Sequence, residues 1–328
     1  MPRSPKTRRT LADVGESALI ARISGLAGRT PGRDWALRIG DDAAILRPRK
    51  GEELVLSVDA QVEGTHFRFG REGAGTIGRR AMAVNLSDLA AMGARPVGAL
   101  LSLCAPADGL VSDFDGIVRG FVAEGARVGC PLVGGNLSRA PGWSLEVTVV
   151  GGCVAGKALR RRGARPGDEL FVTGVLGRGA LARMRADADA AAGGAGRLSY
   201  VPVPRIEAGR RLARLKGARA CLDVSDGLAT DLENLLAGDG FGAEMEVGSL
   251  PSPRGFFGHC RALGVDPLAV QTLGGEDYEL LFAFRSTQSS DMSGMLSKRL
   301  GVPVTRIGAI TSEKGVRGLP TIGEGHHF

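Results

Sequence analysis

Carboxylate or amide side chains recur beside glycine within otherwise apolar stretches of this chain. The segments with this pattern are IGDDAAIL (39–46), LSVDAQVEGTHF (56–67), AVNLSDLAAMG (83–93), LVGGNLS (132–138), LDVSDGLATDL (222–232) and GGEDYELLF (274–282). Burying an ionised carboxylate without a partner is costly, so a chain that repeats this choice is expected to bind cations there. The whole chain has a net charge of +7, so the acidic segments are local features. We interpret them as sites that gather several divalent metal ions around phosphate groups.

The overall composition is that of an ordinary soluble globular protein. Hydrophobic residues make up 43% and charged residues 23% of the 328 residues, a length that suffices for two domains or one large one. A positive net charge can indicate nucleic-acid binding. However, the basic residues are scattered, and the aromatic residues, at 5%, do not interleave with them as in single-strand binders. We therefore expect no nucleic-acid partner, and phosphorylated small molecules or a solvated basic surface remain as explanations of the charge.

The cysteines and the N-terminus bear on the compartment. The five cysteines form no C-x-x-C pair, and four of them lie in apolar stretches. They are expected to be reduced core residues of a cytoplasmic protein. The basic N-terminus is not followed by an apolar region, and no run approaches the length of a membrane span. We expect neither a secretory signal nor a membrane partner, and we expect residues 1–10 to form a disordered basic tail.

Hydrophobic periodicity divides the chain into two sets of elements. The first set has predicted helices at 11–23, 76–93 and 112–129 and predicted strands at 54–60, 97–103, 131–135 and 144–154. Ser112 is the expected N-cap of the helix at 112–129. The second set alternates strands and helices from 169 to 310, and its segment 186–197 is expected to be a disordered linker. We predict an α+β fold with an N-terminal domain at 11–155 and a C-terminal domain at 156–328.

Two glycine-rich segments resemble phosphate loops without matching one. GGCVAGKA (151–158) has the spacing G-x-x-x-x-G-K, but Ala158 stands where a P-loop needs a hydroxyl, so a β-hairpin turn is favoured. GVLGRG (174–179) is expected to be a strand-to-helix turn whose N–H groups can still meet a phosphate. The four histidines show no zinc spacing, and no G-x-S-x-G elbow supports a hydrolase nucleophile.

Each acidic residue taken alone has an ordinary structural explanation. Asp41 or Asp42 can cap a turn, Asp88 can lie on a solvated helix face, and Asp226 can be the N-cap of the next helix. Asp59 and Asp223 lie at the ends of apolar strands, where ligands are often bound. The repetition of the same arrangement along the chain favours ligand binding over these separate explanations.

The proposed ligands are all oxygen donors, which select hard cations such as Mg²⁺ or Mn²⁺ over zinc. Mg²⁺ is normally held by one or two carboxylates together with water and substrate phosphates, so many carboxylates imply several metal ions. Bound metal ions would also remove the electrostatic obstacle to bringing two anionic phosphates together.

The six segments, in this order and spacing, resemble those of the bacterial thiamine-monophosphate kinases. The combination of GDDAA, SVD, EGTHF, AVNLSDLAAMGA-x-P, LVGGN, DVSDGL and GGEDYELLF carries the resemblance from about residue 11 to the C-terminus. This family belongs to the superfamily of aminoimidazole ribonucleotide synthetase and selenophosphate synthetase. The resemblance implies the two-domain α+β fold of that superfamily. In that fold an N-terminal mixed or antiparallel sheet with helices forms a homodimer interface, and an α/β sandwich follows it.

The same resemblance implies an activity. The family transfers the γ-phosphoryl group of ATP to the phosphate of thiamine monophosphate and so produces thiamine diphosphate. The acceptor would be a phosphate oxygen that is already ionised at neutral pH, so no general base would be needed. Catalysis would then consist of in-line positioning and charge neutralisation by several Mg²⁺ ions.

The resemblance also implies roles for individual residues. The implied Mg²⁺ ligands are Asp42, Ser57, the backbone of Val58, Asp59, Asp88, Asn136, Asp223 and Asp226, with Asp59 and Asp88 at the catalytic centre. The implied ATP contacts are Gly135, Asn136, Arg161 and Ser225. The implied thiamine monophosphate contacts are His66, Glu276 and Ile322. A loop histidine without a function is the alternative for His66.

Two positions depart from the family pattern. Asn136 stands where many relatives have Asp, and its carbonyl oxygen is expected to be a weaker ligand. The C-terminal TIGEGHHF lacks the aromatic residue that relatives place before the final His-Phe, which leaves Ile322 and His326 as candidates for the pyrimidine contact.

Two alternatives to this function stay open. One is another ATP-dependent enzyme of the superfamily. Selenophosphate synthetase would need a reactive cysteine and a glycine-rich N-terminus, which this sequence lacks. The hydrogenase-maturation relative would need a C-terminal cysteine, which is also missing here. The other is a non-catalytic nucleotide or metal sensor, against which the retained acidic segments argue.

Overall fold

The structure is a computed structural model that describes residues 9–28, 34–238, 240–286 and 291–319. The chain divides into two compact units, which are described separately below. The first comprises Met1–Asn85 and Pro96–Gly151, and the second comprises Leu86–Arg95 and Gly152–Phe328. The end of the long helix α2 (Ala74–Ala91) is therefore grouped with the second unit.

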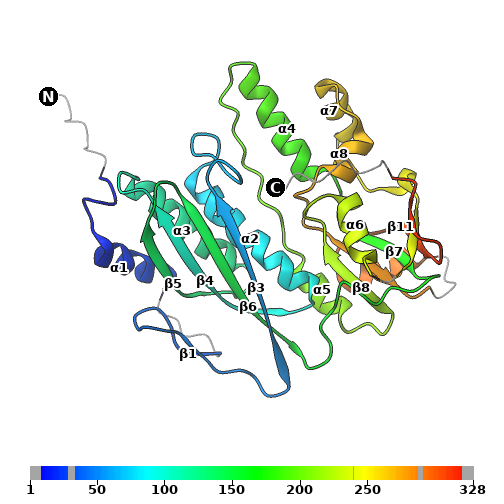
Figure 1. Cartoon of the computed structure of the whole chain (residues 1–328), viewed down its shortest axis with the longest axis horizontal. Coiled ribbons are helices and arrows are strands. Elements are labelled where there is room, and N and C mark those ends of the chain that lie inside the picture. The colour runs from blue at the N-terminus through cyan, green and yellow to red at the C-terminus, as the bar shows by residue number, and fades with distance from the viewer. Residues whose placement is uncertain (1–8, 29–33, 239, 287–290, 320–328) are drawn as a thin grey trace. The chain divides into compact units, whose positions relative to one another are not determined.

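The first unit is built on a four-stranded sheet with the order β3-β6-β4-β5. Its elements in chain order are α1 (Glu16–Ala27), β1 (Trp35–Leu37), β2 (Ile45–Leu46), β3 (Glu52–Val62), α2, β4 (Arg95–Ala105), α3 (Val111–Ala126), β5 (Leu132–Arg139) and β6 (Ser144–Val154). Strands β4 and β5 run parallel, and β1 and β2 form a separate antiparallel pair. Figure 1 shows α2 and α3 side by side along one face of the sheet.

Glycines let α2 and α3 approach each other at the level of the backbone. A Cβ atom on Gly78 would lie 1.9 Å from the carbonyl oxygen of Ile117, and one on Gly120 would lie 2.1 Å from the carbonyl oxygen of Gly75. Glycine in a helix interior is unfavourable relative to alanine, so close helix packing explains its presence here. This contact holds the first part of α2 against α3.

The second unit contains a six-stranded sheet with the order β12-β9-β11-β7-β10-β8. Its remaining elements are β7 (Glu169–Thr173), α4 (Arg178–Ala191), α5 (Ile206–Leu212), β8 (Ala218–Asp223), α6 (Leu228–Leu236), β9 (Gly242–Met245), η1 (Val247–Ser249), α7 (Phe256–Leu263), α8 (Pro267–Leu273), β10 (Leu280–Phe284), α9 (Met292–Leu300), β11 (Val304–Thr311) and β12 (Gly315–Arg317). Neighbouring strands pair antiparallel, except for the parallel pair of β12 and β9.

Side chains on both faces of this sheet are buried. Leu170, Val172 and Leu281 belong to a core cluster that includes the apolar face of α6. Because side chains alternate along a strand, the rings of Phe171 and Phe282 lie on the opposite face, where they stack with centroids 5.6 Å apart. The second unit is thus an α/β sandwich, and the predicted two-domain α+β fold is confirmed.

Three local predictions differ from the structure. Leu110 is the N-cap of α3 and no side chain caps this helix, so the prediction of Ser112 as N-cap was wrong. Helix α4 runs to Ala191 and so covers the first half of the predicted linker 186–197, because its alanine-rich sequence favours a helix. The glycine-rich turn after β6 is not a hairpin, since the next strand, β7, belongs to the other sheet.

Other predictions concern the chain ends and the cysteines. Residues 1–8 of the predicted tail lie outside the described residues, whereas Thr10 pairs with Leu110 in an isolated bridge. All five cysteines are free thiols, and all except Cys104 are buried. Within the described part of the chain, no helix combines the length and apolarity that crossing a membrane requires.

We expect Gly78→Ala to lower the free energy of unfolding by about 1–3 kcal/mol, because the added methyl group would push α2 and α3 apart. Gly75→Ala is the matched control, since its Cβ would meet its nearest neighbour, Gly116, at 3.8 Å, an ordinary contact distance. Urea unfolding followed by circular dichroism measures both variants. Equal midpoints for the two variants and the unmodified protein would contradict the proposed packing constraint.

Candidate functional site

The acidic loop before β2 lies between two hollows of the first unit. Cavities of about 590 and 470 Å³ share Ile39, Asp41, Asp42, Gly134, Gly135 and Asn136 in their linings. The loop and β5 therefore bring the predicted metal ligand Asp42 together with Gly135 and Asn136. Asp41, the neighbour of Asp42, lines the same two cavities.

Local geometry explains the residue types on β5. Gly135 has a φ of 156°, and a Cβ atom there would lie 1.9 Å from the carbonyl oxygen of Leu101 on the paired strand β4, so only glycine fits. The amide nitrogen of Asn136 donates a hydrogen bond to Ser138 Oγ at 2.8 Å. Its carbonyl oxygen is then the atom that can serve as a metal ligand.

Strand β3 and the loop after it carry four further predicted site residues. Ser57, Val58 and Asp59 lie on β3, and Val58 and Asp59 are exposed. His66 is also exposed, and its Nδ1 accepts a hydrogen bond from the backbone N–H of Val62 at 3.1 Å. This bond places the proton of a neutral imidazole on Nε2, so the ring can donate to an anion. None of these four residues lines the two cavities.

In the second unit, Asp223 at the end of β8 lies near Asp88 and Arg161. The Asp223 side chain accepts a hydrogen bond from Ser87 Oγ at 2.5 Å, and the residue is 8% exposed. Burial, and then the negative charge of Asp88, raise the pKa of Asp223 to about 6, while Ser87 and Arg161 act in the opposite direction. Two carboxylates that disfavour each other's ionisation form a site that a cation would stabilise.

The next acidic pair lies at the start of α6. Gly227 is the N-cap of α6 and no side chain caps it, so Asp226 does not have the N-cap role that was its ordinary alternative. Instead, the backbone N–H of Asp226 donates to Asp231 Oδ2 at 2.9 Å. Burial, together with the charges of Asp226 and Asp223, raises the pKa of Asp231 to about 7. The sequence reasoning missed Asp231, although an aspartate in the first turn of an apolar helix was a signal.

The segment that contains Glu276 runs beside the one that contains Ser225. The backbone N–H of Glu276 donates to the carbonyl oxygen of Ser225, and that of Tyr278 donates to the carbonyl oxygen of Val224, each at 2.8 Å. The structure thus brings the predicted ATP contact and the predicted substrate contact together. The carboxylate of Glu276 also pairs with Arg183 on α4, a residue that the sequence reasoning did not single out.

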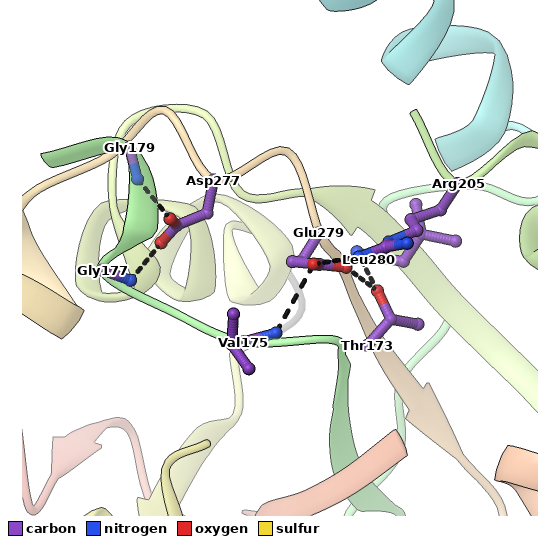
Figure 2. Close-up of polar contacts among 8 residues, drawn as sticks. All are labelled: Thr173, Val175, Gly177, Gly179, Arg205, Asp277, Glu279 and Leu280. Carbon is purple, nitrogen blue, oxygen red and sulfur yellow. Dashed lines mark hydrogen bonds and ion pairs between the residues drawn. The ribbon is translucent and has the colours of Figure 1, made fainter. Parts of the chain in front are cut away.

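The glycine-rich loop 174–179 does not offer its N–H groups to a phosphate. The backbone N–H groups of Gly177 and Gly179 donate to the carboxylate of Asp277 at 2.6 and 3.0 Å (Figure 2). The expectation that this turn can meet a phosphate is therefore corrected, because an internal carboxylate occupies that position.

The donor chemistry of the site suits Mg²⁺. Asp42 in the first unit and Asp88, Asp223 and Asp226 in the second offer only oxygen atoms as ligands, and burial together with the charge of Asp88 raises the pKa of Asp223. Among the described residues, no group of three or more His, Cys, Asp or Glu side chains is arranged to hold a metal ion by itself. Substrate phosphates and water would therefore have to complete the coordination. The predicted contact Ile322 lies outside the described residues, as does His326.

Comparison with known proteins identifies related chains over nearly the whole length. The family model described as AIR synthase related protein, N-terminal domain, matches residues 40–155, and that of the C-terminal domain matches residues 165–319. The curated thiamine-monophosphate kinase of Synechococcus elongatus is 35% identical over 326 residues, covering 94% of this chain and 92% of the relative.

Solved structures agree with the sequence matches. The crystal structure of thiamine-monophosphate kinase from Stenotrophomonas maltophilia has a TM-score of 0.77 and 37% identity, covering 91% of this chain and 94% of that one. A structure described as AaThiL complexed with AMPPCP and TMP has a TM-score of 0.73 and 28% identity, covering 98% of this chain and 100% of that one. Together with the acidic motifs, these matches show that the chain belongs to the thiamine-monophosphate kinase family of the AIR synthase related proteins.

Proposed function

We propose that this protein transfers the γ-phosphoryl group of ATP to thiamine monophosphate, which gives thiamine diphosphate and ADP. The pair of the buried Asp223 and the half-buried Asp88 is the observation that carries the proposal. In a chain of this family, such a pair beside Arg161 suits a cation that is shared with phosphate groups. The relative with AMPPCP and TMP bound supports the choice of ATP and thiamine monophosphate as substrates.

The protein's own residues would act by binding and orienting the two phosphates. We propose Asp42, Ser57, Val58, Asp59, Asp88, Asn136, Asp223 and Asp226 as the residues that hold several Mg²⁺ ions. When bound, Mg²⁺ would neutralise the phosphate charges. We propose Gly135, Asn136, Arg161 and Ser225 as ATP contacts. The guanidinium of Arg161 suits a phosphate because it stays charged and can donate two parallel hydrogen bonds.

The acceptor side of the site would use His66, Glu276 and Ile322. The Nε2 proton of His66 can be donated to the phosphate of thiamine monophosphate, and the carboxylate of Glu276 can face the cationic thiazolium ring. The acceptor phosphate is already ionised at neutral pH, so its oxygen needs no general base. In-line alignment and charge stabilisation then suffice for the transfer.

We propose that the active protein is a homodimer that works in the cytoplasm. Strand β3 lies at the edge of its sheet and exposes Leu54, Leu56 and Val58, the last two by 64% and 66%. Contiguous apolar side chains on a sheet edge favour coverage by a second protein surface. The free thiols are consistent with a reducing compartment.

The activity is tested by incubating the purified protein with MgATP and thiamine monophosphate. We expect thiamine diphosphate and ADP to form in equal amounts, as measured by anion-exchange chromatography. Binding of ATP without turnover would contradict the kinase proposal and favour a nucleotide sensor. Turnover with another phosphate acceptor alone would favour a different enzyme of the superfamily.

Asp88→Asn and Asp59→Asn should each lower kcat by about 100-fold or more, because each would remove a charge that stabilises the metal-bound phosphates. Asp108→Asn, at an exposed turn between β4 and α3, is the matched control and should retain normal turnover. Initial rates at saturating Mg²⁺ measure the effect. Near-normal rates in both site variants would show that the metal site is misplaced.

The stability of the metal-free protein should depend on Asp223. Its pKa of about 6, against an ordinary value of 3.8, means that the folded state binds the proton more tightly than the unfolded chain. This contribution to stability is complete below 3.8 and is lost as the pH rises through about 6. Asp223→Asn should therefore raise the free energy of unfolding above neutral pH by about 1–3 kcal/mol in EDTA.

Thermal unfolding with and without Mg²⁺ provides the measurement and its control. Mg²⁺ with an ATP analogue should raise the Tm of the unmodified protein more than that of Asp223→Asn. An Asp223→Asn variant that is less stable in EDTA, or equally stabilised by Mg²⁺, would speak against a cation at this position.

A further inference from the structure

The backbone around Glu276 is held in an unusual conformation. Glu276 and Tyr278 have φ angles of 63° and 54°, in the left-handed region that residues other than glycine rarely adopt. Each such residue costs about 1–3 kcal/mol unless the surroundings stabilise it. Asp277 lies between these two residues, so its contacts decide whether the conformation is kept.

The carboxylate of Asp277 is bound to the N-terminus of α4. The residue is 5% exposed, and it accepts hydrogen bonds from the N–H groups of Gly177 and Gly179 at 2.6 and 3.0 Å (Figure 2). The N–H groups at a helix start have no partner within the helix and carry a partial positive charge, so a carboxylate is a well-matched acceptor. The side chain thereby ties the segment 276–278 to α4.

Glu279 binds the other end of the same loop. Its carboxylate, on a residue that is 3% exposed, accepts hydrogen bonds from Thr173 Oγ1 at 2.7 Å and from Arg205 Nε at 2.6 Å (Figure 2). Thr173 Oγ1 in turn accepts a bond from the backbone N–H of Leu280 at 2.8 Å. Two carboxylates, spaced two residues apart, thus hold both ends of the loop 173–179.

The backbone on either side of Glu276 is in close contact with neighbouring segments. A Cβ atom on Gly179 would lie 2.5 Å from the carbonyl oxygen of Glu276, and one on Gly275 would lie 2.6 Å from that of Ser225. Glu276 is therefore enclosed between the start of α4 and the segment that carries Ser225. The guanidinium of Arg183 on α4 contacts the Glu276 carboxylate and donates to the carbonyl oxygen of Gly274 at 3.1 Å.

We propose that Asp277 is a positioning residue, which fixes the Glu276 carboxylate for substrate binding by tying its backbone to the N-terminus of α4. This inference rests on the proposed function, in which Glu276 meets thiamine monophosphate. Glu279 supports the same geometry from the end of β7. Loss of the Asp277 bonds would release the left-handed residues on either side, and Glu276 would leave its position while the ATP contacts remain.

The test uses Asp277→Asn in the full-length protein. The two N–H groups of Gly177 and Gly179 donate to different carboxylate oxygens of Asp277. Asn replaces one of these oxygens with an NH₂ group, which cannot accept a hydrogen bond, so one of the two bonds is lost. We expect the KM for thiamine monophosphate to rise about 10–100-fold, as for other groups that orient a ligand-binding side chain, and the KM for ATP to change less than about twofold. In a Glu276→Gln background the same substitution should add little, because Asp277 acts through Glu276.

The matched control is Asp291→Asn. Asp291 also accepts a backbone N–H bond at a helix start, from Gly294 at 2.8 Å, but it caps α9 and has no role in the site. Its loss should lower stability without changing either KM. If Asp277→Asn behaves like this control, or if its effect adds in full to that of Glu276→Gln, the positioning role is overturned.

Amide hydrogen exchange provides a readout that does not depend on activity. Exchange at residues 175–179 and 276–278 should become faster in Asp277→Asn and stay unchanged in Asp291→Asn. Unchanged exchange in both variants would overturn the proposal.

Absence of turnover by the unmodified protein would instead contradict the proposed function. If Asp277→Asn does not fold, Thr173→Val is tested instead, because it removes the hydroxyl that donates to Glu279. We then expect a smaller rise in the KM for thiamine monophosphate. An unchanged KM for thiamine monophosphate would count against the proposal.

Discussion

A carboxylate that leaves water must be compensated within the fold, and much of the second unit is arranged around this requirement. The carboxylate of Asp277 accepts hydrogen bonds from backbone N–H groups, and that of Glu279 accepts hydrogen bonds from a guanidinium and a hydroxyl group. Asp223 has a hydroxyl bond from Ser87, and it faces the charge of a second carboxylate, Asp88. The first two accept several hydrogen bonds from the chain itself. The third lies beside a second carboxylate, an arrangement that a bound cation would stabilise.

Backbone groups can compensate a carboxylate only where the chain comes very close to itself. In the second unit, glycines at 179 and 275 let the segment 274–282 approach the backbone at the start of α4 and the backbone of Ser225 without intervening side chains. The abundance of glycine beside acidic residues in the sequence follows from this geometry. Glycine supplies the close approach and the N–H donors, and the acidic residue supplies the acceptor.

The sequence predicted the fold class well, because long apolar strands and amphipathic helices such as those around Asp88 and Asp223 have clear periodicity. It did not predict β1, β2 or β12, which are two or three residues long and too short to show a pattern. Nor could it distinguish Asp226 from Asp231, or foresee that Asp277 binds the loop at 177–179. Those distinctions depend on burial and on contacts between residues about 100 positions apart, such as Asp277 and Gly177.

The exposed apolar edge of β3 has a consequence for how the protein behaves in solution. On this strand, exposed Leu54, Leu56 and Val58 alternate with positions that include Ser57 and Asp59. If a second copy covers the apolar row, dilution uncovers this edge strand. The folded chain would then be most prone to irregular strand pairing at concentrations where the dimer dissociates, so its shelf life would depend on concentration as well as on temperature.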